Sequence, residues 1–397
     1  MPRRRDANQY ALAPVHHIKP QGTLTVEAAE NTAVSIQAAA TRGERVTLDL
    51  SRTRTYQIGA AARLGNSLRK VALASNLDLN LPTDPVGRQQ LLLSGIGPQL
   101  AQYASTIREA NKANTRNLRK ALCAEVGPNG LAFRIDDLKR HPKLVRRSPQ
   151  RTQELLTSWL SQLSGQSDRL LAAAEVELVA KIVHEAVLNV QDHSDKAPLV
   201  GAADVHSYAS LRWRSASEIA LSPSGFDNED PSSLYLQRAT TETPFGVAGG
   251  FVEIMIVDDG TGVAPRQALD AGIADGADYG PERAALAEAL MAGGTVKLRA
   301  KDCPIEMTPG YGSHEISERV IDLAAFVCIR TGRFIAHLDG LRLRAEGQEL
   351  VDETETSFRL ETRTRRPLAG TILSILIPSF SKPLAKRLIP HTPTALF

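Results

Sequence analysis

The clearest pattern of polar and apolar positions along this chain lies near its middle, between Lys181 and His193. Polar residues recur there every four positions, at Glu185, Asn189 and His193, while most residues between them are apolar. An α-helix places positions four apart about one turn from each other on the same side. The pattern therefore predicts a helix with one polar edge and a buried opposite face. A carboxylate beside a carboxamide on that edge indicates a ligand site.

A second pattern is the almost continuous apolar run Phe251–Val257, which predicts a buried strand. The run stops at Asp258, and Gly260 and Gly262 follow in a DxGxG turn. A carboxylate fixed at a strand end can accept a hydrogen bond from an exocyclic amine, and glycines let the backbone approach a ligand closely. By themselves, the same residues are equally typical of an acidic hairpin turn.

Glycines also precede a second helix and a terminal strand. Gly310 and Gly312 lead directly into a segment with helical spacing of apolar residues, up to Leu323. The free amides at such a helix start can hold phosphate oxygens, although a lone GxG also serves ordinary tight turns. Further on, Gly370–Pro378 begins with Gly-Thr and predicts a buried strand.

The rest of the chain gives a coarser pattern. The first hundred residues alternate strand and helix patterns and predict a small α/β unit, with strands at 23–26, 45–50 and 71–77 and helices at 30–42 and 59–71. Residues 103–170 are charged and predict a mainly helical region. Residues 221–250 are rich in Ser, Pro, Gly and acidic residues, and they predict a surface loop.

Composition narrows the class of protein. A chain of 397 residues with 42% hydrophobic residues can form two domains with real cores. A net charge of +3 gives no argument for nucleic acid as a partner. No apolar run approaches the length of a membrane span, and no secretory signal follows the first arginines. Cys123, Cys303 and Cys328 are widely spaced, which fits a reducing compartment. We therefore expect a cytoplasmic protein with no membrane partner.

Taken together, the four motifs resemble the GHKL ATPase family in their order and spacing. That family includes gyrase-type topoisomerases, histidine kinases, mismatch-repair ATPases and anti-sigma-factor kinases. The resemblance covers residues 165–380. It implies an α/β (α+β) Bergerat fold, in which helices cover a mixed sheet, and it implies ATP and Mg²⁺ as cofactors.

The resemblance also implies roles for individual residues. Asn189 would hold Mg²⁺ against the triphosphate, and Glu185 would polarise the attacking water or hydroxyl as the catalytic base. Asp258 would accept a hydrogen bond from the adenine amino group, with Thr371 near the adenine. His193 would either face the phosphates or pack behind them.

The glycines and the lid complete the implied site. Gly260 and Gly262 would shape the adenine pocket, whereas Gly310 and Gly312 would place backbone amides on the phosphates. Residues 263–309 would form a lid over ATP, from which Lys297 could reach the γ-phosphate, although the sequence favours a solvated lysine. The chain departs from many relatives at the residue after Gly312, which is serine where they have leucine.

Residues 21–105 resemble the STAS fold of anti-sigma-factor antagonists. The resemblance rests on Val46–Ser51, on a helix that begins at Gly59 and on Leu92–Ile96. The family often carries a phosphorylatable serine just before that glycine, but this chain has Gln57-Ile58 there. The resemblance therefore implies a docking or sensing module more than a phosphoswitch.

These resemblances give an expected organisation and function. We expect a tail, a STAS-like domain, a helical connector, a histidine-kinase-like ATPase domain and a second tail, at residues 1–20, 21–105, 106–164, 165–380 and 381–397. Such a protein would be a signal-transduction regulator that hydrolyses ATP slowly as a switch and binds a protein partner through the STAS-like module. Two alternatives use the same residues: an anti-sigma-type serine/threonine kinase, and a nucleotide-sensing scaffold without turnover. A homodimer is a further expected state, as in many relatives.

Overall fold

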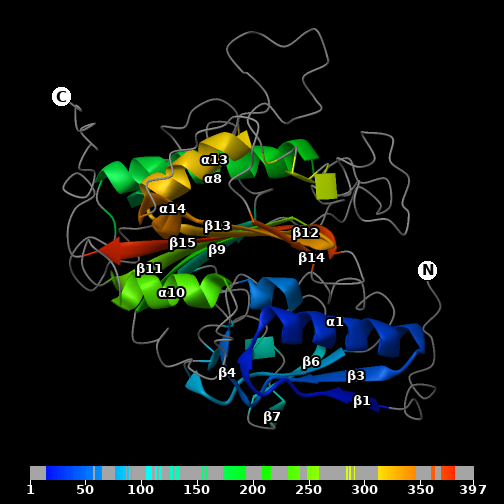
Figure 1. The fold of residues 1–397 in the computed structure, drawn as a ribbon. Helices are drawn as coiled ribbons and strands as arrows, with labels where there is room; N and C mark the ends of the chain where they lie inside the picture. Colours follow the sequence, from blue (N-terminus) through cyan, green and yellow to red (C-terminus); the bar gives the residue numbers. More distant parts are fainter. Residues whose placement is uncertain are drawn as a thin grey trace, which may run out of the picture. The chain divides into compact units, whose positions relative to one another are not determined.

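The protein is a mixed α/β chain with both parallel and antiparallel sheets (Figure 1). It divides into two compact units whose boundary in the sequence lies at Gly127. The computed structural model describes residues 15–56, 59–64, 77–85, 87–88, 91, 104–109, 112–113, 116–118, 126–127, 130–134, 154, 157–158, 171, 173–193, 208–215, 231–241, 248–258, 283–284, 286–287, 290, 312–345, 359–362 and 368–380.

The first unit contains a five-stranded sheet with the order β1-β3-β5-β6-β7. Its neighbouring strands are parallel, except that β6 and β7 are antiparallel. A separate parallel pair joins β2 and β4. The elements are β1 (Val15–Ile18), β2 (Gly22–Leu24), α1 (Val26–Thr41), β3 (Arg45–Asp49), β4 (Thr53–Tyr56), β5 (Leu77–Asn80), β6 (Ala104–Glu109) and β7 (Lys112–Ala113).

Helix α1 begins one turn earlier than its apolar spacing predicts because Thr25 caps it. The Thr25 hydroxyl accepts a hydrogen bond from the Ala28 amide at 3.0 Å, which satisfies one of the free amides of the first turn. The helix buries Ala29 and Ile36 against the sheet, where Val46, Leu48 and other residues complete the core of this unit. The central strands β3 and β5 are buried on consecutive positions, as expected for parallel strands that are covered on both faces.

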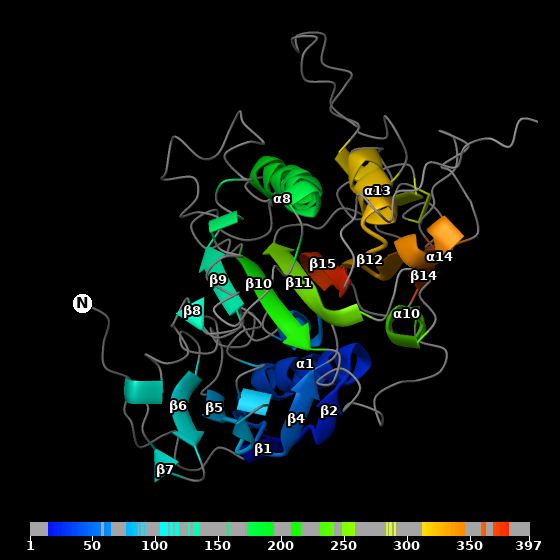
Figure 2. The ribbon, with the colours of Figure 1, turned by 90° about the vertical axis from the view of Figure 1, so that its left-hand side faces the viewer.

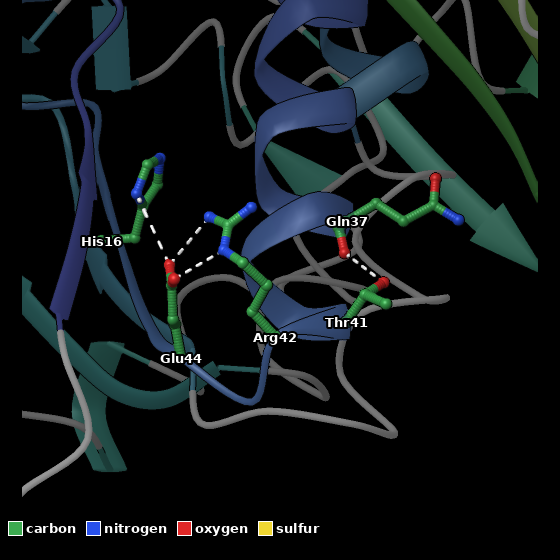
Figure 3. A network of polar contacts seen from close by, with 5 residues as sticks. All are labelled: His16, Gln37, Thr41, Arg42 and Glu44. Carbon is green, nitrogen blue, oxygen red and sulfur yellow. Dashed lines mark hydrogen bonds and ion pairs between the residues drawn. The ribbon is translucent and has the colours of Figure 1, made fainter.

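A polar network joins the end of α1 to the edge strand β1 (Figure 3). Arg42 donates to both carboxylate oxygens of Glu44, at 2.6 and 3.0 Å, and this hydrogen bonding lowers the pKa of Glu44. His16 Nδ1 lies 3.7 Å from the same carboxylate. One turn back, Thr41 donates to the Gln37 carbonyl oxygen. The carboxylate of Glu44 thus connects the helix end with β1 across the start of β3.

The second unit contains seven of the strands of an eight-stranded sheet with the order β14-β13-β12-β15-β11-β10-β9-β8, in which β8 ends at the boundary between the units. The pairs from β9 to β14 are antiparallel. The strands are β8 (Val126–Gly127), β9 (Gly130–Arg134), β10 (Tyr208–Ser215), β11 (Ala248–Asp258), β12 (Phe326–Gly332), β13 (Phe334–Asp339), β14 (Arg359–Thr362) and β15 (Leu368–Phe380). The helices are α8 (Ala173–His193), α10 (Pro231–Thr241), α13 (Gly312–Asp322) and α14 (Gly340–Ala345).

Helices α8 and α13 lie side by side over one face of this sheet, and α10 lies on the other (Figures 1 and 2). Alternate residues of each central strand point to the helix pair. On β11 these are Val252, Ile254 and Ile256, which share one buried cluster with Val183 of α8 and Val320 of α13. The main core of the unit therefore lies between the helix pair and the sheet.

The described helix α10 shows that the surface-loop prediction for residues 221–250 is wrong. Pro231 occupies the first helical position, where a missing amide hydrogen costs nothing. Tyr235 is completely buried, its ring lies 5.2 Å from that of Phe326, and its hydroxyl donates to the Ala324 carbonyl oxygen at 2.9 Å. A segment whose composition is typical of a loop therefore contains a helix, and Tyr235 of this helix packs on the second face of the sheet.

The expected helical region at residues 103–170 is also wrong where the structure describes strands, namely at β6, β7, β8 and β9. Only Ala104 and Ile107 of β6 are buried, so too few apolar positions are present for strand alternation to be recognised. Strand β1 likewise lies within the expected N-terminal tail, and it starts with Val15, which is 47% exposed. In the part of the chain that the structure describes, no helix is long and apolar enough to span a membrane.

Gly340 offers a direct test of how closely α14 packs on the end of α13. Its amide donates to the Ala325 carbonyl oxygen at 2.8 Å, and a Cβ atom at this position would lie 2.3 Å from the Val320 carbonyl oxygen. We expect Gly340→Ala to lower the free energy of unfolding in urea by about 1–3 kcal/mol, because backbone atoms must move to admit the methyl group. Gly249→Ala is the control, since its nearest atom lies 3.9 Å away. Equal stability of the two variants would contradict this packing.

Candidate functional site

Helix α8 carries the polar edge that the sequence predicts. The predicted helix is confirmed, with Val179, Ile182 and Ala186 buried against the sheet. Glu185 is half-buried, between the core side of the helix and solvent. Asn189 and His193 belong to the described backbone of α8, but the orientation of their side chains lies outside what the structure describes. The role of Asn189 as a Mg²⁺ ligand stays a prediction.

The second part of the site is a row of polar residues at one end of the sheet. Asp258, the last residue of β11, pairs with Thr371 of β15, which pairs in turn with Thr331 of β12. Each of the three lies two positions from a residue of the core beneath the helix pair, namely Ile256, Leu373 and Ile329. Residues two positions apart on a strand lie on the same face of the sheet, so the three polar residues lie on the face that carries α8 and α13. The structure thus brings together Asp258 and Thr371, two residues that the sequence predicts for one site.

The polar row is largely withdrawn from solvent. Asp258 is 9% exposed and Thr331 is 0% exposed, whereas Thr371 is half-buried. The hydroxyl oxygens of Thr371 and Thr331 lie 3.4 Å apart, within hydrogen-bonding reach. A buried carboxylate next to two hydroxyls has the chemistry to accept hydrogen bonds from an amine-bearing ligand. These residues therefore fit the amino group of adenine.

Sequence reasoning missed Thr331. It ends the strand Phe326–Gly332, in which apolar and polar residues alternate only imperfectly. Its importance comes from pairing with a strand that begins 36 residues later, and no local pattern reveals that pairing.

Helix α13 starts toward the same end of the sheet. It begins at Gly312 and buries Ile316 and Val320, and the predicted helix is thereby confirmed. A tight turn through Ala324 joins its end to the start of β12, and the helix lies back along that strand (Figure 1). Its first turn is therefore directed to the end of the sheet where β12 finishes with the polar row. Helix N-terminal amides in that position can face an anion.

Several predicted site residues cannot be placed. Lys297 and three of the four predicted glycines lie outside the described residues, namely Gly260, Gly262 and Gly310. Within the described residues, no group of three or more His, Cys, Asp and Glu side chains is arranged to hold a metal ion.

The opposite face of the sheet carries a buried charged cluster that sequence reasoning also missed. Arg212 donates to Glu253 Oε2 through Nε at 2.6 Å and through Nη2 at 2.5 Å, and Arg214 Nη1 lies 3.4 Å from the same oxygen. Glu253 is 1% exposed, so its charge is compensated by these arginines and not by solvent. The cluster is separated from the polar row by the sheet itself.

Comparison with known proteins gave no match. The chain matches no protein-family model, no curated protein and no solved structure.

His184, beside Glu185 on α8, should make the stability of the protein depend on pH. Burial lowers the pKa of His184 from its ordinary value of 6.5. The unfolded chain therefore binds this proton more tightly than the folded chain. The free energy of unfolding should be highest above about pH 6.5 and should fall as the pH decreases toward the lowered pKa.

Urea unfolding of the wild type and of His184→Gln between pH 8 and pH 5 measures this effect. The wild type should lose more stability over this interval than the variant. His17→Gln is the control, because His17 is exposed on β1. If the free energy of unfolding depends on pH in the same way in His184→Gln and the wild type, His184 is not held in its neutral form in the folded protein.

Proposed function

We propose that this protein is an ATP-binding regulatory protein of the GHKL class, in which the second unit is a Bergerat-type domain that binds Mg-ATP. The observation that carries the proposal is the in-register pair of Asp258 and Thr371 on the face covered by α8 and α13. The two residues come from motifs more than a hundred positions apart in the sequence. Their meeting at one strand end is what an adenine site of this class requires.

The burial of Asp258 supports adenine as the base. Asp258 is 9% exposed, and its carboxylate can accept a hydrogen bond from the exocyclic amine of adenine. Guanine would present a carbonyl oxygen at the same place, and two acceptors would then face each other. The site therefore favours ATP over GTP.

The two helices supply the other groups that the proposal needs. Glu185 of α8 is the proposed base, Asn189 the proposed Mg²⁺ ligand, and the start of α13 at Gly312 the proposed phosphate cradle. Bound Mg²⁺ would neutralise phosphate charge, while the chain itself would orient the attacking oxygen. Slow hydrolysis of ATP would then limit how long the protein remains in its ATP-bound form.

The first unit is the proposed docking module. Its parallel strands β1, β3, β5 and β6 and its helix α1 support a STAS-like domain. Binding of ATP would order the lid and change how this module meets a protein partner, which is an order–disorder switch. The proposal assigns partner recognition to the first unit and nucleotide chemistry to the second.

Nucleotide binding tests the central assignment. Titration of the full chain with ATP and MgCl₂ by calorimetry should give saturable binding, and GTP should bind more weakly. Asp258→Asn should weaken ATP binding by about 10- to 100-fold, because a hydrogen bond to a charged group is lost. Asp322→Asn, a carboxylate at the far end of α13, is the matched control and should bind as the wild type does. Normal ATP affinity in Asp258→Asn would remove this residue from the site.

Turnover distinguishes the proposed function from its two alternatives. With γ-labelled ATP, release of phosphate indicates hydrolysis, label on an added partner protein indicates a kinase, and neither indicates a nucleotide-sensing scaffold. Glu185→Ala should slow either reaction about 100-fold or more while ATP still binds. Glu177→Ala, two turns earlier on α8 and exposed, is the control. Retained turnover in Glu185→Ala would exclude Glu185 as the base.

A further inference from the structure

Cys328 lies on the second face of the eight-stranded sheet, the face that carries α10. Its neighbours on β12, Val327 and Ile329, belong to the core beneath the helix pair, so the side chain of Cys328 points to the opposite face. Cys328 is half-buried, whereas both of these neighbours are buried. A small reagent can therefore reach this cysteine from solvent.

Two polar residues flank Cys328 in register. His337 on β13 lies directly opposite it on one side, and Ser374 on β15 lies directly opposite it on the other. Directly opposite residues of antiparallel strands share a face, and their Cβ atoms are about 4.5–5.5 Å apart. An imidazole, a thiol and a hydroxyl thus form one row across three strands. Both flanking residues are withdrawn from solvent, with His337 7% exposed and Ser374 1% exposed.

The hydroxyl of Ser374 is a donor beside the thiol. Within the residues that the structure describes, no group lies in hydrogen-bonding position to its Oγ. A buried hydroxyl in that state is unfavourable and points to an acceptor that would join it. On the side away from Cys328, the residue opposite Ser374 is Met255, whose thioether accepts only weakly. An oxygen atom added to the sulfur of Cys328 would supply the acceptor.

The imidazole of His337 and a nearby positive charge favour a reactive thiol. The ring stacks on Phe326, with the ring centroids 5.9 Å apart. An imidazole beside a thiol can take its proton, and the thiolate is the form that reacts. Arg330, two positions along β12 on the same face, is 3% exposed and adds a positive charge, while Asp339 on β13 is paired with Arg238 of α10. Such surroundings are typical of reactive cysteines.

We propose that Cys328 is a site of oxidation by hydrogen peroxide, at which His337 activates the thiol and Ser374 stabilises the product. The imidazole takes the thiol proton, the thiolate sulfur attacks one peroxide oxygen, and the O–O bond breaks. The sulfur loses two electrons and becomes a sulfenic acid, while the departing hydroxide takes the proton from the imidazolium and leaves as water. The Ser374 hydroxyl donates to the new oxygen. This chemistry is independent of the proposed ATP function.

The first test uses the full chain without substitutions. The chain is treated with hydrogen peroxide and dimedone, which traps sulfenic acids, and after trypsin the peptide Val320–Arg330 reports Cys328 alone. We expect trapping at Cys328 to be about tenfold faster in the folded chain than in the chain unfolded in urea, because the imidazole raises the thiolate fraction. Burial alone would make the folded chain slower, so equal or slower trapping overturns the proposal.

The second test assigns the role of the imidazole. His337→Gln should lower the trapping rate in the folded chain to that of the unfolded chain or below, because the proton acceptor is removed. His184→Gln, which replaces a buried histidine of α8, is the control and should react as the wild type does. Trapping in His337→Gln as fast as in the wild type would exclude His337 as the activating group.

The third test addresses the product. When dimedone is added at increasing times after a pulse of peroxide, the decay of trapping gives the lifetime of the sulfenic acid. Ser374→Ala should shorten this lifetime about threefold, since one hydrogen bond to the new oxygen is lost. Ser210→Ala is the control, because Ser210 is a buried serine of the same row that lies beyond Met255. An equal lifetime in Ser374→Ala and the wild type would remove Ser374 from the proposed site.

Discussion

The pairing register of β11, β15 and β12 is the constraint on which the second unit depends. Strand β15 lies between the other two strands and pairs with both along most of its length. Because side chains alternate between the faces of a strand, a slip of one residue in β15 would turn Thr371 away from Asp258 and direct Ser374 into the core beneath the helices. The same pairing register therefore places the polar row at the strand ends and the apolar side chains in the core.

On the second face of the sheet, a charge pair constrains the register between the neighbouring strands β10 and β11. Arg212 and Glu253 are directly opposite each other on β10 and β11. A slip between these strands would separate them and leave a buried carboxylate without its arginine, which is strongly unfavourable. On the helix face, register is specified by burial of apolar side chains, whereas on this face it is specified by a charge pair.

The elements that the sequence predicted are those whose pattern is set by residues close together in the sequence. The helical spacing around Glu185, the apolar run that ends at Asp258 and the helix after Gly312 each appear where their patterns place them. Other features were missed because their stability comes from distant partners. Arg212 and Glu253 alternate with apolar residues and therefore resemble a solvated strand face, although both are buried. Helix α10 depends on Tyr235, whose partners lie on β11 and β12.

The late position of β15 in the chain has a consequence for how the protein is made. The β10–β11 pair and the β12–β13 hairpin can form from segments already synthesised, but they become one sheet only when β15 inserts between them. Contacts of such long sequence separation form slowly and are completed after translation of the last strand. During synthesis, Asp258 is thus present without Thr371, so the polar row stays incomplete until β15 has joined the sheet. Completion of the row requires completion of the sheet.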